Sequence, residues 1–295
     1  MTDARIADRG YRPYAGARTS VAGVVRALIW QTIKQALGIG RRWTLKIAPV
    51  LTILVSFIPA IVFLGITAFI GSSIQDDETR QFLAELDFLP DYPDSYSYIT
   101  LAIALFVTFV APEVLCPDRR TGMLGMYLAS PLTRGTYLMA KGAAVAIVLS
   151  IITIGPGMLL LVGFTAQNAG PDTFVDWITA AARILGGGAA IATLFAAFSL
   201  AVSSLTDRKG VASAAIALVL IGSAGLSDAL VDGGQSEALR LINLWQLPIE
   251  LLYRIFGQAG NWDVSTAAVV GTYALVTGLS IATIIISYRR MDVRR

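Results

Sequence analysis

Six long apolar segments dominate this 295-residue sequence, and they restrict the fold that it can adopt. The apolar core of a bilayer requires about 20 residues of helix per crossing, and a backbone inside it has to satisfy its own hydrogen bonds. The sequence therefore predicts an all-α, polytopic membrane protein with six transmembrane helices. We place these spans near residues 47–71, 97–116, 137–165, 178–205, 210–230 and 264–288.

The charged residues between these segments indicate an orientation. If the N-terminus is cytoplasmic, the cytoplasmic side holds all of the 23 Lys and Arg residues except Arg80, Arg183, Arg240 and Arg254. Loops on the cytoplasmic side of membrane proteins carry the excess of Lys and Arg. We therefore expect a multi-pass protein with both termini in the cytoplasm. The abundance of Ala and Gly, and of Arg over Lys, favours a bacterial plasma membrane.

The N-terminal region is predicted to contain two parts. Residues 1–18 are polar and read as a flexible cytoplasmic tail, so residues 19–295 form a single transmembrane domain. Within residues 19–42, a helical wheel separates a mostly apolar side from a polar one. The polar side holds Arg26, Gln31, Lys34 and Arg41, and the mostly apolar side holds Val21, Val24, Val25, Leu28, Ile29, Thr32, Ala36 and Ile39. A basic amphipathic helix of this kind suits the headgroup layer of a membrane. The alternative is a charged extension of the first span.

The composition excludes several classes of enzyme. The sequence has no histidine and one cysteine, Cys116. A Ser-His or Cys-His catalytic site cannot be built without histidine, and one cysteine forms neither an internal disulfide nor a thiolate metal cluster. The sequence has no G-x-x-x-x-G-K-[ST] phosphate loop, and its basic residues lie at the ends of apolar blocks rather than on one nucleic-acid-binding face. We expect a chain that is not an enzyme, binds no metal or cofactor, and has no nucleic-acid partner.

The cytoplasmic stretch 112–141, between the second and third spans, carries the most specific pattern. Asp118 follows a proline and is predicted to cap the N-terminus of a short helix. Met123, Leu124 and Tyr127 give this helix an apolar face, and Pro131 is predicted to end it at Ser130. A short amphipathic helix joined closely to two spans is suited to docking into a groove on a partner.

The segment DRRTGMLGMYLASPL resembles part of the type-2 ATP-binding-cassette (ABC-2-type) permease family, where it typically reads E-R-x-x-G-T-L followed by S/T-P-L. The matching positions are Asp118, Arg119, Gly122, Leu124, Ser130, Pro131 and Leu132. Two positions depart from the pattern, since Asp118 replaces the family's Glu and Met123 replaces its Thr. The six spans, the N-terminal amphipathic helix and an apolar hairpin before the last span are also similar to that family.

The resemblance implies the transmembrane permease subunit of a bacterial ATP-driven exporter. Its coupling helix would dock a separate cassette-type ATPase that binds ATP and Mg, and the docking residues would be Asp118, Arg119, Arg120, Gly122, Met123, Leu124, Tyr127, Ser130 and Pro131. The chain would pair with a second copy or a related permease among membrane lipids. Its apolar spans favour a lipid-like, amphiphilic or drug-like cargo that moves outward.

Two further cytoplasmic features are open to more than one interpretation. Glu113 is a candidate coupling carboxylate that pairs with Arg119, Arg120 or a neighbouring span; otherwise it is solvated at headgroup depth. The run Asp207, Arg208 and Lys209 is a candidate second contact with the ATPase; otherwise it is only a tight, charged turn.

The stretch 231–263 is too apolar for a free loop and too interrupted by polar residues for a span. We predict one or two short interfacial or re-entrant helices there, forming an outer hairpin before the last span. Its candidate gate residues are Trp245, Pro248, Glu250 and Arg254, and the spacing of Glu250 and Arg254 predicts an ion pair on one helix face. Otherwise its aromatic residues form an interfacial belt.

Two other functions compete with an ATP-driven exporter. A secondary active transporter, not coupled to ATP, predicts ionisable residues near mid-membrane, and the span centres contain essentially none. An intramembrane enzyme needs catalytic groups within the spans, which this composition hardly supplies. A cassette-type ATPase encoded beside the gene distinguishes the exporter from both.

Overall fold

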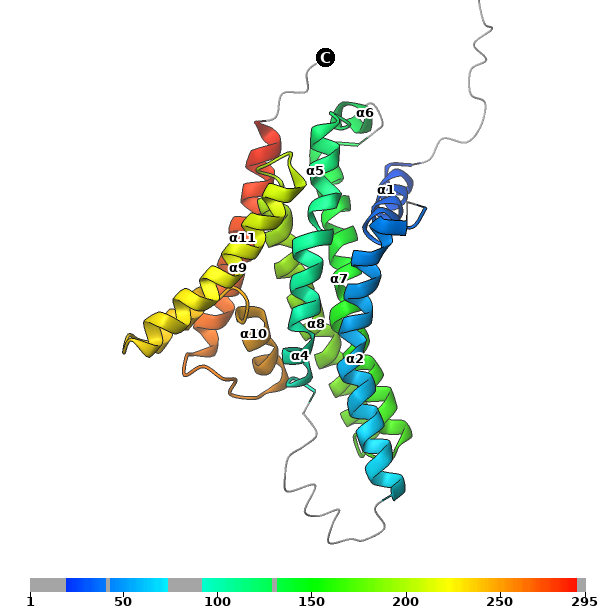
Figure 1. Cartoon of the computed structure of the whole chain (residues 1–295), viewed down its shortest axis with the longest axis vertical. Coiled ribbons are helices and arrows are strands. Elements are labelled where there is room, and N and C mark those ends of the chain that lie inside the picture. Colours follow the sequence, from blue (N-terminus) through cyan, green and yellow to red (C-terminus); the bar gives the residue numbers. More distant parts are fainter. Residues whose placement is uncertain (1–19, 41–42, 74–91, 129–131, 291–295) are drawn as a thin grey trace, which may run out of the picture.

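The computed structural model describes residues 20–40, 43–73, 92–128 and 132–290, and this part of the chain is all-helical (Figure 1). The predicted tail 1–18 lies outside the described residues. The elements are α1 (Val21–Ala36), α2 (Trp43–Ser73), α4 (Ser95–Leu105), the π-helical η1 (Phe106–Val110), α5 (Pro112–Arg120), α6 (Leu124–Leu128), α7 (Arg134–Ala166), α8 (Phe174–Ser203), α9 (Lys209–Asp232), the 3-10 helix η2 (Glu237–Ile242), α10 (Leu247–Phe256) and α11 (Thr266–Arg289).

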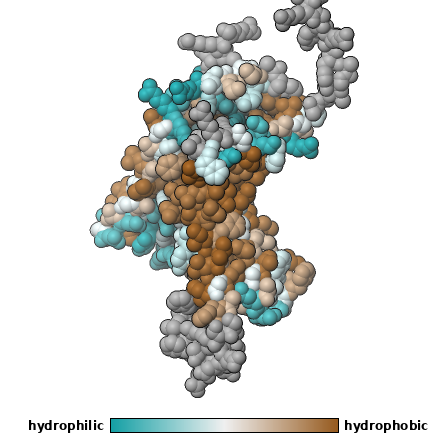
Figure 2. Space-filling view, turned by 45° about the vertical axis from the view of Figure 1, so that its right-hand side comes forward, coloured by the Kyte–Doolittle hydropathy of each residue, from teal (hydrophilic) through white to brown (hydrophobic). Residues whose placement is uncertain are grey.

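Six helical stretches are long and apolar enough to cross a membrane, which confirms the predicted number of spans. They are Lys46–Phe69, Ser95–Arg120, Arg134–Ala166, Phe174–Ser203, Lys209–Asp232 and Thr266–Arg289. A broad apolar belt covers the middle of the molecule between more polar ends (Figure 2). The chain is therefore a multi-pass membrane protein.

The start of α1, the end of α5, α6 and the end of α11 lie at one end of the bundle, which we call the α6 end (Figure 1). The turn between α8 and α9 lies there too, because the Cys116 thiol of α5 donates to the Ser203 and Thr206 carbonyls at 3.8 and 3.7 Å. The short helix α10 lies away from this end and packs against α8 and α11.

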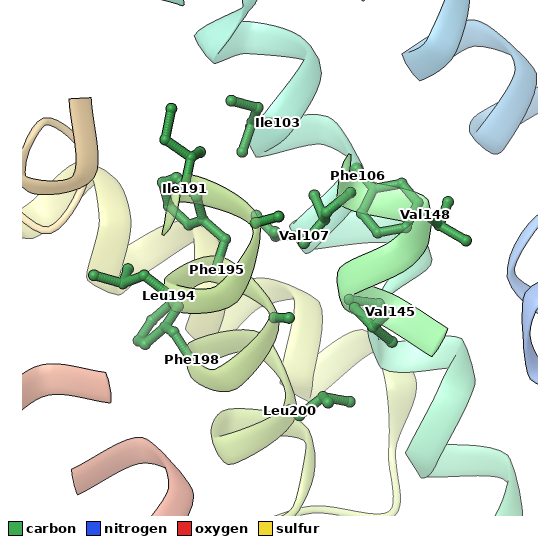
Figure 3. Packing of buried hydrophobic residues seen from close by; sticks show 14 of the residues in the cluster. Ile103, Phe106, Val107, Val145, Val148, Ile191, Leu194, Phe195, Phe198 and Leu200 are labelled. Atoms are coloured by element: carbon green, nitrogen blue, oxygen red, sulfur yellow. The ribbon is translucent and has the colours of Figure 1, made fainter. Parts of the chain in front are cut away.

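The core is centred on α8, the most buried of the six spans. Ile191, Phe195 and Leu200 of α8 belong to the same buried apolar cluster as Phe106 and Val148 of the second and third spans (Figure 3). By contrast, α2, α9 and α11 leave most of their side chains partly or fully exposed, although those side chains are apolar. Apolar side chains at the surface of a multi-pass protein are suited to lipid or to a neighbouring membrane chain.

Two prolines shape the second span, which consists of α4, η1 and α5. The amide of Ala111 donates to the Phe106 carbonyl five residues back, so the helix widens to a π turn directly before Pro112. Pro117 lies inside α5 and has no amide proton for the carbonyl of Glu113. The Gln35 side chain of α1 donates to that carbonyl instead, at 2.8 Å, and so ties α1 to α5.

The predicted N-terminal amphipathic helix is present as α1, and Ser20 caps its first turn. Leu28, Thr32 and Ala36 of the predicted apolar side are buried, whereas Val21 and Ile39 of that side are exposed. The helix packs against α7 and α5. Trp30 is exposed on the other side, with the Lys34 ammonium 5.3 Å from its ring centroid. The sequence pattern therefore identified the face that this helix buries.

The run Gly186, Gly187 and Gly188 in α8 permits close packing at two of its three positions. A Cβ on Gly187 would lie 2.7 Å from Leu252 Cδ1 of α10, and one on Gly188 would lie 2.6 Å from Ile154 Cγ1 of α7. A Cβ on Gly186 would meet nothing within 4 Å. The close approach brings the Thr153 hydroxyl within 2.9 Å of the Gly188 carbonyl, to which it donates.

Alanine at the two ends of this run is expected to act in opposite directions. Gly188→Ala overpacks the α7–α8 contact and should destabilise the protein by about 1–3 kcal/mol. Gly186→Ala gains helix propensity and should stabilise it by about 0.5–1 kcal/mol. Thermal unfolding of the two purified variants in one detergent measures the difference. A Gly188→Ala midpoint at or above that of Gly186→Ala would contradict the packing argument.

Candidate functional site

The second span ends at Arg120, and Gly122, a position that the sequence pattern singled out, follows directly after its C-cap residue Thr121. Gly122 has φ +67°, a left-handed conformation that favours glycine. The Gly122 amide donates to the Arg119 carbonyl at 3.3 Å, and the Met123 amide donates to the Asp118 carbonyl at 3.0 Å. These two bonds form a Schellman helix stop. The chain therefore leaves α5 in a fixed direction and begins α6 at Leu124.

The prediction that Asp118 caps a surface helix is wrong. Asp118 lies two residues before the end of α5, and its side chain is 7% exposed. α5 continues through Pro117, because Gln35 satisfies the carbonyl that the proline leaves free. The predicted docking segment is thus divided between the end of α5 and the separate helix α6.

Asp118 is instead the centre of a buried polar cluster. Its Oδ2 atom accepts a hydrogen bond from the Tyr137 hydroxyl and an ion pair from the Lys141 ammonium, both at 2.8 Å. Lys141 is 1% exposed and also donates to the Val114 carbonyl at 3.2 Å. Both partners come from α7, so the cluster joins α5 to α7. A buried ion pair offsets the cost of desolvation only when its geometry is good and further hydrogen bonds satisfy both groups, as they do in this cluster.

The cluster reaches α6 through Tyr127. The Tyr127 and Tyr137 rings are 5.3 Å apart, and the Lys141 ammonium lies 5.8 Å from the Tyr127 ring centroid, within cation–π range. Burial, and then the Asp118 carboxylate, raise the pKa of Tyr127. We call Asp118, Tyr127, Tyr137 and Lys141 the α6 anchor, because they fasten α6 to the ends of α5 and α7.

At the α6 end, two arginines link α5 and α7 to α11. The Arg119 guanidinium donates to the Ser287 hydroxyl at 3.3 Å and lies 5.9 Å from the Tyr288 ring centroid. Arg134, the first residue of α7, donates to the Tyr288 and Arg289 carbonyls at 3.0 and 3.2 Å. The ends of α5, α7 and α11 are thus joined by side chains rather than by packing alone.

The remaining docking candidates have different exposures. Arg120 and Gly122 are exposed, and Met123 is half-buried. Met126, which the sequence argument did not select, is 70% exposed on α6. Ser130 and Pro131 lie outside the described residues, as does the side chain of Leu124. Arg120 and Met126 are therefore accessible side chains near α6.

Glu113 forms an ion pair with Lys209, the first residue of α9. The prediction that Glu113 pairs with a neighbouring span is confirmed. Asp207 and Arg208 of the same turn are exposed, and the amide of Arg208 donates to the Thr206 hydroxyl at 3.2 Å. The two predicted cytoplasmic segments thus meet along α5, at Glu113 and Cys116, although they are about 90 residues apart in sequence.

The outer candidates form a second buried cluster around α10. The predicted pair is confirmed, because Arg254 Nη2 donates to Glu250 Oε1 at 2.8 Å. Glu250 is 2% exposed, and its Oε2 also accepts from the Asn261 amide at 2.9 Å. Arg254 donates to the Trp262 and Val264 carbonyls at 3.0 and 3.1 Å. We call Glu250 and Arg254 the α10 clasp, since they hold the loop after α10 against the helix.

The backbone around the clasp fits it closely. Gly260 has φ +75°, and a Cβ on it would lie 2.0 Å from Glu250 Oε1. At the buried face of α10, the Tyr253 hydroxyl donates to Asp94 Oδ1 before α4 at 2.6 Å. Burial, and then this hydrogen bond, raise the pKa of Tyr253. α10 is therefore fixed to both the second span and the chain that leads into α11.

Pro248 begins the first turn of α10, and Trp245 lines an adjacent cavity of about 580 Å³. The other lining residues come from the start of α4, from α9, from η2 and α10 with the connection between them, and from the loop after α10: Ser97, Ile221, Ala224, Gly225, Asp228, Arg240, Asn243, Gln246, Ile249, Glu250, Asn261 and Trp262. The four outer candidates thus lie together, beside a cavity with polar walls.

Sequence reasoning missed three partners at the α6 end: Tyr137, Lys141 and Gln35. Lys141 lies two turns inside a span and was counted only as a topology signal. A lysine at that depth needs a polar partner, so its position in the sequence already indicated a buried pair. A comparison with models of known protein families finds none that matches this chain, and a search of the curated proteins also finds no match.

Proposed function

We propose that this chain is the permease subunit of an ATP-driven exporter of the ABC-2 type, in a bacterial plasma membrane with both termini in the cytoplasm. It is not itself an enzyme: a separate cassette-type ATPase binds ATP and Mg and docks at the α6 end. Two permease chains, identical or related, enclose a path for a lipid-like, amphiphilic or drug-like compound. The proposal is supported chiefly by the α6 anchor.

The α6 anchor would couple any movement of α6 to the helix bundle. A force applied to α6 passes through Tyr127 to Tyr137 and Lys141, and from them to Asp118 at the end of α5. Arg119 and Arg134 carry it on to α11. A loosely attached surface helix would move alone, whereas this one would tilt three spans together. An exporter needs such coupling, because the ATPase that drives its motion lies outside the membrane.

The charge at the α6 end supports its assignment to the cytoplasm. Arg120, Arg208 and Arg289 are exposed there, at the ends of three different spans. Positively charged side chains at span ends favour the cytoplasmic face. An ATPase has to be on that face, where its ATP is found.

The test is co-purification with the cassette-type ATPase encoded nearest to the gene. Met126→Asp and Arg120→Glu alter exposed side chains near α6 and should each lower the amount of bound ATPase by about tenfold, the effect of losing about 1.4 kcal/mol. Phe174→Asp is the control, because Phe174 is 76% exposed at the start of α8, far from α6 along that helix. Asp118 is unsuitable for this test, since its replacement would disturb the core.

Two results would overturn the proposal. One is undiminished assembly and ATP hydrolysis with both α6 variants. The other is transport by the reconstituted chain that continues without any ATPase and stops when the ion gradient is dissipated. The second result would identify a secondary active transporter.

A further inference from the structure

An apolar groove opens between α7, α8 and α11 near the α6 end. Its volume is about 410 Å³, and its walls include Leu138 and Ala143 of α7, Ala197 and Leu200 of α8, and Ile284 of α11. Lys141 also contributes to the wall, but its ammonium is directed to Asp118. The α7 wall runs from Gly135 to Ala146, which is about 16 Å of helix at 1.5 Å per residue. The groove therefore has the form of an apolar channel that follows α7.

Basic residues lie at the head of this groove. Gly135 is the first lining residue on α7, and Arg134 precedes it. The Arg134 guanidinium lies within hydrogen-bonding distance of the Tyr288 and Arg289 carbonyls at the end of α11. The side chains of Arg289 and Arg290 are exposed beside it. The charges are thus at the ends of two spans, where headgroups lie, and the groove extends from them to acyl-chain depth.

We propose that the groove binds one anionic glycerophospholipid from the leaflet on the α6 side. An acyl chain occupies the channel formed by α7, α8 and α11, and the phosphate is bound by the arginines at its head. Basic pockets between transmembrane helices recognise anionic headgroups in this way, because the arginines attract the phosphate at the depth where it lies. The lipid also fills space beside the α6 anchor, since Lys141 forms part of the groove wall.

A second copy of the chain fits this site less well. A two-fold axis along the membrane normal places identical residues at the same depth, so an interface centred on the groove would bring the two arginine groups toward each other. Like charges at a shared interface are unfavourable. The arginines therefore complement a phosphate rather than another copy of the same surface.

The test uses the purified chain in nanodiscs, without ATPase, so its outcome is independent of the docking proposal. Met139 lines the groove and is 74% exposed. Met139→Cys can be labelled selectively with a small fluorophore, because Cys116 is the one native cysteine and is buried. Brominated phosphatidylglycerol should quench this label at about fivefold lower mole fraction than brominated phosphatidylcholine. The control is Ala214→Cys on the exposed side of α9, where the two lipids should quench equally.

Two variants test the headgroup part and the acyl-chain part of the site separately. The double variant Arg289→Gln/Arg290→Gln should reduce the preference for phosphatidylglycerol at position 139. Ala143→Trp should fill the channel and lower the amount of phosphatidylglycerol that native mass spectrometry finds bound, whereas Ala214→Trp should not. Equal quenching by both lipids at position 139 would overturn the proposal. The proposal would also be overturned if neither lipid quenched the label and if Ala143→Trp dissociated a dimer. The occupant of the groove would then be a second copy of the chain.

Discussion

Lys141→Met is expected to destabilise the protein by about 3–5 kcal/mol, the cost of leaving one partner of a buried ion pair unpaired. Methionine preserves the length and the apolar stem of the side chain, so the main loss is the ammonium. Asp118 would keep the Tyr137 hydroxyl as a donor but lose its ion pair at 2.8 Å, in a site where its side chain is 7% exposed. Thermal unfolding of the purified chain in detergent measures the effect.

Two controls show whether burial causes this loss. Lys209→Met removes the partner of Glu113, but the Lys209 side chain is 43% exposed, and exposed pairs contribute about 0–1 kcal/mol. The double variant Asp118→Leu/Lys141→Met removes both charges and should recover most of the loss, because apolar residues of similar volume replace a buried pair at little cost. If Lys141→Met unfolds no earlier than Lys209→Met, the α6 anchor does not stabilise the bundle.

Glu250→Ala is expected to have an effect of similar size, about 3–5 kcal/mol, because it leaves Arg254 without its ion-pair partner at a site that is mostly buried. The Arg254 side chain is 13% exposed, and the carboxylate also accepts from the Asn261 amide. Hydrogen exchange should therefore accelerate most strongly in residues 257–265, the loop held by the α10 clasp. Thermal unfolding gives the global part of the loss.

Glu237→Ala is the matched control for this second prediction. Glu237 also pairs with an arginine one turn away, Arg240, but the two side chains are 43% and 30% exposed. Its loss should amount to about 0–1 kcal/mol. Exchange in residues 257–265 that stays at the wild-type rate in Glu250→Ala would show that the loop is held by packing rather than by the clasp.

The sequence predicted the spans well because each one is a continuous apolar block. The third span was predicted at 137–165 and is found at Arg134–Ala166; the fifth was predicted at 210–230 and is found at Lys209–Asp232. Local rules were also sufficient for the Glu250–Arg254 pair and for the buried face of α1, since both depend on helical spacing alone.

The site was predicted less completely, because its contacts join residues that are distant in sequence. Asp118 was assigned to a surface cap since Asp is a favoured N-cap residue and a negative charge suits a helix N-terminus. Its true partners, Tyr137 and Lys141, follow in the next span, and Gln35, which allows α5 to continue past Pro117, precedes it by about 80 residues. A helical wheel reports which residues share a face, not which other helix meets that face.

The π turn at Phe106–Val110 has a consequence for comparing this protein with its relatives. One extra residue in a helical turn advances every later side chain by about 100° around the axis. Asp118 reaches Lys141 with this offset in place. We therefore expect deletion of a single residue from 106–110 to rotate the carboxylate away from α7 while leaving the span long enough to cross the membrane. Relatives with a regular second span should therefore align with this chain across a one-residue gap, and an insertion or deletion there should change the partner of the acidic position.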